Sequence, residues 1–168
     1  MRLISSAVLA VTIGYASFAL AAAPTNIALH KPYVFSDAPN YSLCTDAGDA
    51  TDLTDGVYPK PKNGSALWGN KGCVGWNHIR KPISVTIDLE KVEPISGASF
   101  STAAGGGGVS YPRSLAISVS EDGKTFSTVG DLTVLDESDP PPPYGQYSIH
   151  TYRTNQLHTK GRYVRITA

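Results

Sequence analysis

The sequence has few of the residues from which reactive or metal sites are built. Only two cysteines and four histidines occur in 168 residues, and no histidines have the HxH or HExxH spacing that holds a catalytic metal. Ser110 follows Gly108 as in a nucleophile elbow, but the closing glycine two residues after the serine is missing, because Pro112 stands there. Gly123-Lys124-Thr125 looks like the end of a phosphate loop, but Ser118 stands where its first glycine belongs. Paired carboxylates for glycoside hydrolysis stay open, but no pair stands out. The sequence therefore nominates no catalytic site.

Net charge is also lacking. The 14 basic and 14 acidic residues cancel, and removing Arg2 with a leader segment leaves 13 against 14, a net charge of −1. A nucleic-acid-binding domain needs a basic surface to neutralise phosphates, and a peripheral membrane protein needs a basic cluster for anionic lipids. The sequence has neither, and it suits a neutral partner such as a sugar.

Long hydrophobic runs are absent except at the start of the chain. Arg2 precedes an uncharged run that ends in Ala21-Ala22-Ala23, the pattern of a secretory signal peptide over residues 1–23. An uncleaved membrane anchor is the alternative, because the run is long enough to span a bilayer. The alanine-rich end and the polar interruptions favour cleavage. We therefore expect one domain at 24–168 in a secreted, extracellular or periplasmic protein.

The expected export of the protein bears on the state of its two cysteines. Cys44 and Cys73 would most simply form one disulfide, worth roughly 3–4 kcal/mol in the chain-entropy model for a loop of this length. A two-cysteine metal site is the rival, but His30 and His78 have no zinc-like spacing to these cysteines. The disulfide is the expectation, with a structural role.

Helical periodicity is missing from residues 24–168, whereas strand periodicity is frequent. Val85, Ile87 and Leu89 alternate with polar residues, so one face of this run can be buried. Comparable runs predict strands at about 83–89, 95–102, 113–120, 125–130, 147–152 and 162–167. Asp122-Gly123 between two of them is a hairpin signal. The class is an all-β sandwich.

Two irregular segments interrupt the strands. Residues 35–75 have many turn formers and little periodicity, and long loops of this kind are usually functional. Pro140-Pro141-Pro142-Pro143 favours a stiff polyproline II segment on the surface, either as a loop between strands or as a ligand for another module. The glycines at 105–108 precede no helix that could bind a phosphate.

Six short motifs in order cover this domain. They are Asn26-Ile27-Ala28-Leu29 with Lys31-Pro32, Leu53-Thr54-Asp55-Gly56 before Leu67-Trp68, Val85-Thr86-Ile87-Asp88-Leu89, Ile95, Ser118-Val119-Ser120-Glu121-Asp122-Gly123-Lys124-Thr125-Phe126, and Gly161-Arg162-Tyr163-Val164-Arg165-Ile166. With these motifs the chain resembles the discoidin domain, also called the coagulation factor five/eight type C domain, of the galactose-binding-like sandwiches. It is most similar to bacterial extracellular modules of the carbohydrate-binding type. The resemblance implies a jelly-roll β-sandwich with ligand-binding loops at one end.

In carbohydrate-binding relatives, aromatic, His, Arg and Asn side chains on those loops contact the sugar. An aromatic face covers the apolar face of a sugar ring, and planar donors fix its hydroxyls. The best match here is Trp76, Asn77, His78 and Arg80. The alternatives are that Trp76 is a core aromatic and that His78 and Arg80 are ordinary solvated residues. Trp68 matches the family's core tryptophan. Further candidates on other loops are Tyr111, Tyr144, Tyr147 and His150.

Many relatives also hold a structural calcium ion beside the Asp-Gly motif. Calcium takes six to eight oxygen ligands, and the resemblance implies Asp55 as a ligand with Asp52 close enough to assist. The alternative for Asp55 is a turn residue that accepts backbone N–H groups. Relatives continue into a final strand that supplies another carboxylate, whereas this sequence stops at Ala168. Two interpretations are open: the sequence is a fragment of a longer protein, or it is a shortened variant without the last strand.

The sequence favours a non-catalytic module that binds a glycan or polysaccharide. Two rival functions remain open. One is a structural or protein-interaction module that docks a neighbouring domain or a cell-surface protein. The other is an enzyme, or the N-terminal accessory domain of a longer extracellular enzyme such as a glycoside hydrolase.

Overall fold

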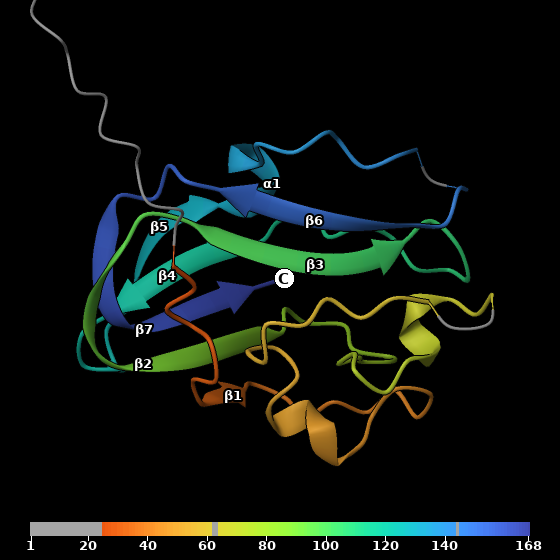
Figure 1. Ribbon diagram of the computed structural model, residues 1–168, viewed down its shortest axis with the longest axis horizontal. Helices are drawn as coiled ribbons and strands as arrows, with labels where there is room; N and C mark the ends of the chain where they lie inside the picture. Colours follow the sequence, from red (N-terminus) through yellow and green to blue (C-terminus); the bar gives the residue numbers. More distant parts are fainter. Residues whose placement is uncertain (1–24, 62–63, 144) are drawn as a thin grey trace, which may run out of the picture.

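The computed structural model describes residues 25–61, 64–143 and 145–168. Their strands form two antiparallel sheets, one of five strands and one of two, which face each other as a sandwich (Figure 1). This confirms the predicted all-β class. Within the described residues, no helix is long and apolar enough to cross a membrane. The predicted signal peptide at 1–23 lies outside this part of the chain.

The central strand of the larger sheet is β7 (Thr159–Thr167), the last strand in the sequence. The strands of this sheet, in spatial order, are β1 (Tyr33–Phe35), β2 (Ser84–Ile95), β7, β4 (Ala116–Ser120) and β5 (Ser127–Asp131). β7 therefore has partners on both sides, and Ile83 and Ala168 extend its pairing with β2 through N···O distances of 3.1 and 2.9 Å. The strand runs predicted for β2, β4, β5 and β7 are confirmed, and only the three-residue β1 was not predicted.

The smaller sheet covers the core from the other side. It pairs β3 (Ala98–Ala104) with β6 (Ser148–Thr154), and the one-turn helix α1 (Leu132–Leu135) follows β5. The apolar positions of the alternating runs meet between the sheets. The buried cluster comprises Leu89, Ile95, Leu115, Ile117, Val119, Leu132, Tyr152, Leu157 and Val164.

The predicted hairpin joins β4 to β5. Gly123 has a φ of 72°, which a side chain disfavours. The carboxylate of Asp122 accepts the amides of Lys124 and Thr125 at 2.8 and 2.9 Å. These local bonds lower the pKa of Asp122, and the bond from the Lys124 amide has the largest effect. The turn therefore forms from its own sequence, as predicted.

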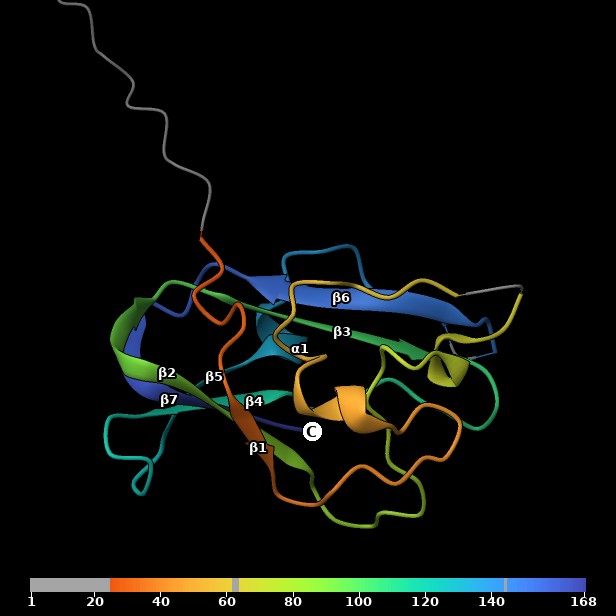
Figure 2. The same cartoon turned by 60° about the horizontal axis from the view of Figure 1, so that its bottom comes forward.

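The long irregular segment lies beside this sandwich. It contains two short 3-10 helices, η1 (Ala47–Ala50) and η2 (Leu67–Gly69). η2, the glycine loop after β3 and the start of β6 gather at one end of the sandwich, and the β4–β5 hairpin lies at the opposite end (Figures 1 and 2). The fold thus gathers η2, the glycine loop and the start of β6 at a single end.

Candidate functional site

The 76–80 segment is held in place by bonds to an earlier part of the same irregular segment. Asn77 donates its amide to Asn40 Oδ1 at 2.7 Å, and Asn40 Nδ2 donates to the Asn77 carbonyl at 3.2 Å. The amides of Asn40 and Tyr41 both donate to the Gly75 carbonyl at 3.1 Å. Four bonds between residues 34 to 37 positions apart in sequence therefore fix the backbone at 75–77.

Trp76 anchors this backbone. Its indole N–H donates to the Asp37 carbonyl at 2.8 Å, and its ring meets Phe35 of β1 edge to face with centroids 5.4 Å apart. The side chain is half-buried. The N–H is thus committed within the protein, and packing on Phe35 accounts for part of the ring. The structure gives Trp76 the packing role that the sequence had left as an alternative, and a further role as a sugar platform stays a prediction.

The next three candidates present their side chains to solvent. Asn77, His78 and Arg80 are exposed, and His78 has a φ of 58°, in the left-handed region that histidine adopts more readily than most residues. Lys81 beside them pairs with Asp37 at 2.8 Å and holds the pKa of that carboxyl below its usual value. An amide, an imidazole and a guanidinium are therefore exposed on this braced loop, and their role as sugar contacts stays a prediction.

A second aromatic group lies under the glycine loop. Trp68 of η2 meets Tyr147 edge to face at 5.1 Å, and the Leu67 amide donates to the Tyr147 hydroxyl at 2.7 Å. A Cβ at Gly107 would lie 3.3 Å from the Trp68 ring, and one at Gly105 would lie 2.1 Å from the Gln146 carbonyl oxygen. The glycines thus let the loop after β3 close over Trp68 and against the start of β6. This supports the packing role expected for Trp68.

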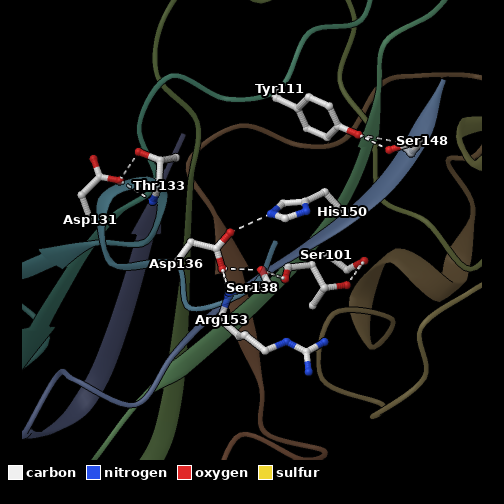
Figure 3. A network of polar contacts seen from close by, with 10 residues as sticks. Ser101, Tyr111, Asp131, Thr133, Asp136, Ser138, Ser148, His150 and Arg153 are labelled. Carbon is white, nitrogen blue, oxygen red and sulfur yellow. Dashed lines mark hydrogen bonds and ion pairs between the residues drawn. The ribbon is translucent and has the colours of Figure 1, made fainter. Parts of the chain in front are cut away.

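His150 was predicted wrongly as a sugar contact. It lies on β6 opposite Thr102, and only 8% of its surface is exposed. Its Nε2 is 2.7 Å from Asp136 Oδ2 (Figure 3). Its ring packs edge to face on Tyr152, with centroids 4.3 Å apart. A ring enclosed in this way cannot reach a ligand. Tyr144, the other distant candidate, lies outside the described residues.

Asp136 is the centre of the polar network around His150. Its Oδ1 accepts the Ser138 hydroxyl at 2.5 Å and the Arg153 amide at 2.9 Å, so both carboxylate oxygens are occupied (Figure 3). Burial by itself would raise the pKa of Asp136, but the bonds from Ser138, the Arg153 amide and His150 lower it to about 2. The network is structural and ties the segment after α1 to β6.

The predicted disulfide is not formed in the structure, where Cys44 and Cys73 are free thiols. The buried Cys44 lies 3.6 Å from the Tyr41 carbonyl, and its Sγ occupies the space beside Gly75. Burial raises the pKa of Cys44, and burial together with Cys44 raises that of Cys73 to about 11. Both groups are therefore protonated near neutral pH and are poor nucleophiles.

The two acidic residues of the expected calcium site have different neighbours. Asp55 Oδ1 accepts the Val57 amide at 2.7 Å, which is the turn role left open by the sequence. Asp52 instead joins Asp46 and Asp49 in a group whose nearest oxygens all lie within 4.8 Å of one another. Calcium held by Asp52 and Asp55 stays a prediction.

Two shallow hollows occur elsewhere on the described surface. One of about 340 Å³ lies on the solvent face of the large sheet, between residues that include Val34, Asp88 and Arg165. The other, of about 240 Å³, lies between the 30–32 and 50–54 segments. Neither is lined by residues of the 76–80 segment.

The family comparison covers most of the domain. A model described as the F5/8 type C domain matches residues 47–168, from η1 to the last residue of the chain. No curated protein matches the chain.

Several solved structures are similar to the chain. One is chitosan-binding module 1 from a chitosanase/glucanase of Paenibacillus sp. IK-5, with 18% identity, a TM-score of 0.47 and coverage of 86% of both chains. Another is CpGH89CBM32-5 of Clostridium perfringens in complex with GalNAc-β-1,3-galactose, with 18% identity, a TM-score of 0.43 and coverage of 83% of this chain and 84% of that chain.

Proposed function

We propose that this chain, which belongs to the F5/8 type C domain family, is a non-catalytic module that binds neutral glycans through the loop at residues 76–80. The residues assigned to the ligand are Asn77, His78 and Arg80. Their side chains offer a carboxamide, an imidazole and a guanidinium, which can donate to and accept from sugar hydroxyls. A near-neutral protein surface matches an uncharged ligand.

The observation that carries this proposal is the contrast between the backbone and the side chains of the loop. The backbone is fixed by the Asn40 and Gly75 bonds and by Trp76, whereas the three polar side chains extend into solvent without a hydrogen bond or ion pair to another described residue. Because the backbone is already fixed, a ligand has to order only the side chains and not the loop. Ordinary exposed residues need no such bracing.

The exposure of these side chains sets the expected strength of binding. Exposed side chains bury few ligand atoms, so the affinity for a single sugar should be modest. Longer oligosaccharides should bind more tightly only where they contact further residues. Trp76 is assigned to hold the loop, and its exposed part could also cover an apolar sugar face.

A glycan array followed by calorimetry tests the proposal. Galactosides are the first neutral probes, and chitosan oligosaccharides, whose amino groups carry positive charge, test a charged ligand, because these sugars are named for the similar solved structures. The His78→Ala/Arg80→Ala double variant should lose binding while its melting temperature stays within about 2 °C of the parent, since exposed substitutions rarely destabilise. Lys124→Ala, at an exposed lysine of the β4–β5 hairpin outside the 76–80 segment, is the matched control and should bind normally.

The outcomes separate the candidate functions. Binding that is lost in the double variant and kept in Lys124→Ala supports the glycan site. The absence of binding to any glycan by a folded parent protein refutes it and favours a structural or protein-interaction module. Binding that persists in the double variant places the site elsewhere.

A further inference from the structure

The solvent face of the large sheet carries a set of side chains in register. Val34 of β1 lies opposite Thr86 of β2, and Thr86 lies opposite Arg165 of β7. Two residues further along β2, Asp88 lies opposite Tyr163. Successive residues of a strand point to opposite faces, and the residues between these positions on β2 and β7 pack in or against the core. These five side chains therefore share the face that points to solvent.

The hollow of about 340 Å³ lies over these side chains. It is also lined by Pro32 and by Gly123 of the β4–β5 hairpin. A Cβ at Gly123 would lie 3.1 Å from the Tyr163 ring, so the turn packs directly on this ring and holds it in place. Sites for small molecules enclose roughly 300–1,000 Å³. The hollow is therefore large enough for a small ligand.

Arg165 is held in a fixed position at this hollow. Its Nε donates to the Thr86 hydroxyl at 3.0 Å, and its guanidinium carbon lies 3.6 Å from the centroid of the Phe126 ring. Within residues 25–61, 64–143 and 145–168, its two Nη groups donate to no other residue and no ion pair reaches them. The four N–H bonds of these groups are therefore available to a ligand.

The negative charge at the hollow is already balanced. Asp88 accepts a bond of 2.8 Å from Arg162 on each of its carboxylate oxygens, and its Oδ1 also accepts the Glu90 amide at 2.7 Å. The nearby Lys31 pairs with the Glu90 carboxylate at 2.5 Å. Among the described residues that line the hollow, Arg165 is thus left with a positive charge and no counter-ion.

The other free groups of the hollow are donors and apolar surface. The Thr86 hydroxyl accepts from Arg165, and its own proton has no acceptor among the described residues. The Tyr163 hydroxyl likewise takes part in no hydrogen bond to the described part of the chain. Val34 exposes 66% of its surface beside these donors. A ligand that fits them has an anionic acceptor, further oxygens and an apolar face.

We propose that this hollow is a second ligand site, which binds the carboxylate of a uronic acid residue in an acidic glycan. A planar guanidinium matches a planar carboxylate through two parallel N–H···O bonds. The single uncompensated charge suits one carboxylate, whereas a phosphate group carries nearly two negative charges. The sugar ring supplies oxygens for Thr86 and Tyr163 and a C–H face for Val34.

Calorimetry on the full chain with trigalacturonate at low salt tests this site. The parent should bind the acid, and binding should weaken as sodium chloride is added, because salt screens an exposed ion pair. The fully methyl-esterified trisaccharide has nearly the same size without the charges. It should bind at least about tenfold more weakly, since a hydrogen bond to a charged group is worth at least this factor.

Variants place the ligand on the sheet face. Arg165→Gln should weaken trigalacturonate binding about tenfold or more. Val34→Asp adds a like charge at an exposed position beside the hollow and should also weaken binding, whereas the uncharged Val34→Asn should weaken it much less. Arg153→Gln removes an exposed arginine from β6 in the other sheet. It is the charge-matched control and should bind as the parent does.

The His78→Ala/Arg80→Ala variant separates this site from the loop of the proposed function, because no residue of the 76–80 segment lines the hollow. Trigalacturonate binding should persist in this variant, whether or not neutral galactosides bind the parent. Loss of binding there, with retention in Arg165→Gln, would overturn the inference.

Three results with the parent protein would also overturn it. These are no binding of trigalacturonate, equal binding of its methyl ester, and tighter binding of a triglutamate peptide or a sulfated galactoside. If Arg165→Gln does not fold, the methyl ester and the comparison of Val34→Asp with Val34→Asn still decide the question.

Discussion

Replacing Asp136 with Asn should remove a defined part of the acid sensitivity of this protein. The carboxylate accepts the Ser138 hydroxyl and the Arg153 amide and contacts His150, with only 10% of its side chain exposed. Asparagine has the same shape but no charge, so these charge-assisted bonds weaken or must rearrange. The substitution therefore tests whether the charge itself stabilises the fold.

The magnitude follows from the pKa of the carboxyl. Hydrogen bonds lower the pKa of Asp136 from 3.8 to about 2 against the effect of burial, and this difference corresponds to roughly 2–3 kcal/mol of unfolding free energy. Because the folded-state pKa is depressed, this stability is fully present above pH ~4. It is lost as the pH falls from about 4 to about 2.

Chemical denaturation at a series of pH values measures this contribution. At pH 7, Asp136→Asn should unfold with a free energy roughly 2–3 kcal/mol below that of the parent, which lowers the melting temperature by about 5–10 °C. Between pH 4 and pH 2 the variant should lose less stability than the parent. Part of the acid sensitivity should remain, because bonds from Ser114, the Leu115 amide and Thr133 also lower the pKa of Asp131 to about 2 despite its burial.

Two results would refute the reasoning. One is an Asp136→Asn variant whose stability falls with acid as steeply as that of the parent. The other is an Asp139→Asn control that loses as much stability at pH 7 as Asp136→Asn does, since Asp139 is exposed on the same segment. The first result would show that Asp136 does not titrate with a depressed pKa. The second would show that the network is not the source of the loss.

Two further predictions concern the loops and the large sheet. Gly105→Ala should destabilise the fold by more than about 2 kcal/mol in thermal or chemical unfolding, because its Cβ would lie 2.1 Å from the Gln146 carbonyl oxygen. Gly108→Ala, with a φ of 79° but open space around it, should cost only about 1 kcal/mol, and equal losses would contradict the packing argument. Arg162→Lys should raise the pKa of Asp88 towards its usual value, because the two Arg162 bonds of 2.8 Å are the first cause of its depression. NMR titration of the Asp88 carboxyl measures this, and an unchanged pKa would contradict it.

Most of the sandwich could be predicted because strand formation here is local. Alternation of apolar residues places Leu89, Ile117 and Val164 on the buried faces of their strands. The turn at Asp122 is stabilised by bonds within four residues of sequence. The three residues of β1 carry too short a pattern to predict, and their pairing with β2 depends on a strand that begins at Ser84, 49 residues after Phe35.

The site was predictable only in part, because its contacts join residues that are far apart in sequence. The sequence placed Asn77, His78 and Arg80 on a loop, where exposure is the ordinary state of polar residues. It could not show that Asp136 encloses His150, or that Phe35 and the Asp37 carbonyl hold Trp76.

The sequence by itself determined the β class, the order of most strands, the hairpin turn and the polar loop at 76–80. Only the tertiary structure decided which candidate side chains are enclosed, that the two thiols are free, and that Asp46, Asp49 and Asp52 converge around Gly48. Periodicity and turn chemistry depend on neighbours in sequence. Burial, hydrogen-bond partners and electrostatic environment depend on residues that become neighbours only after folding.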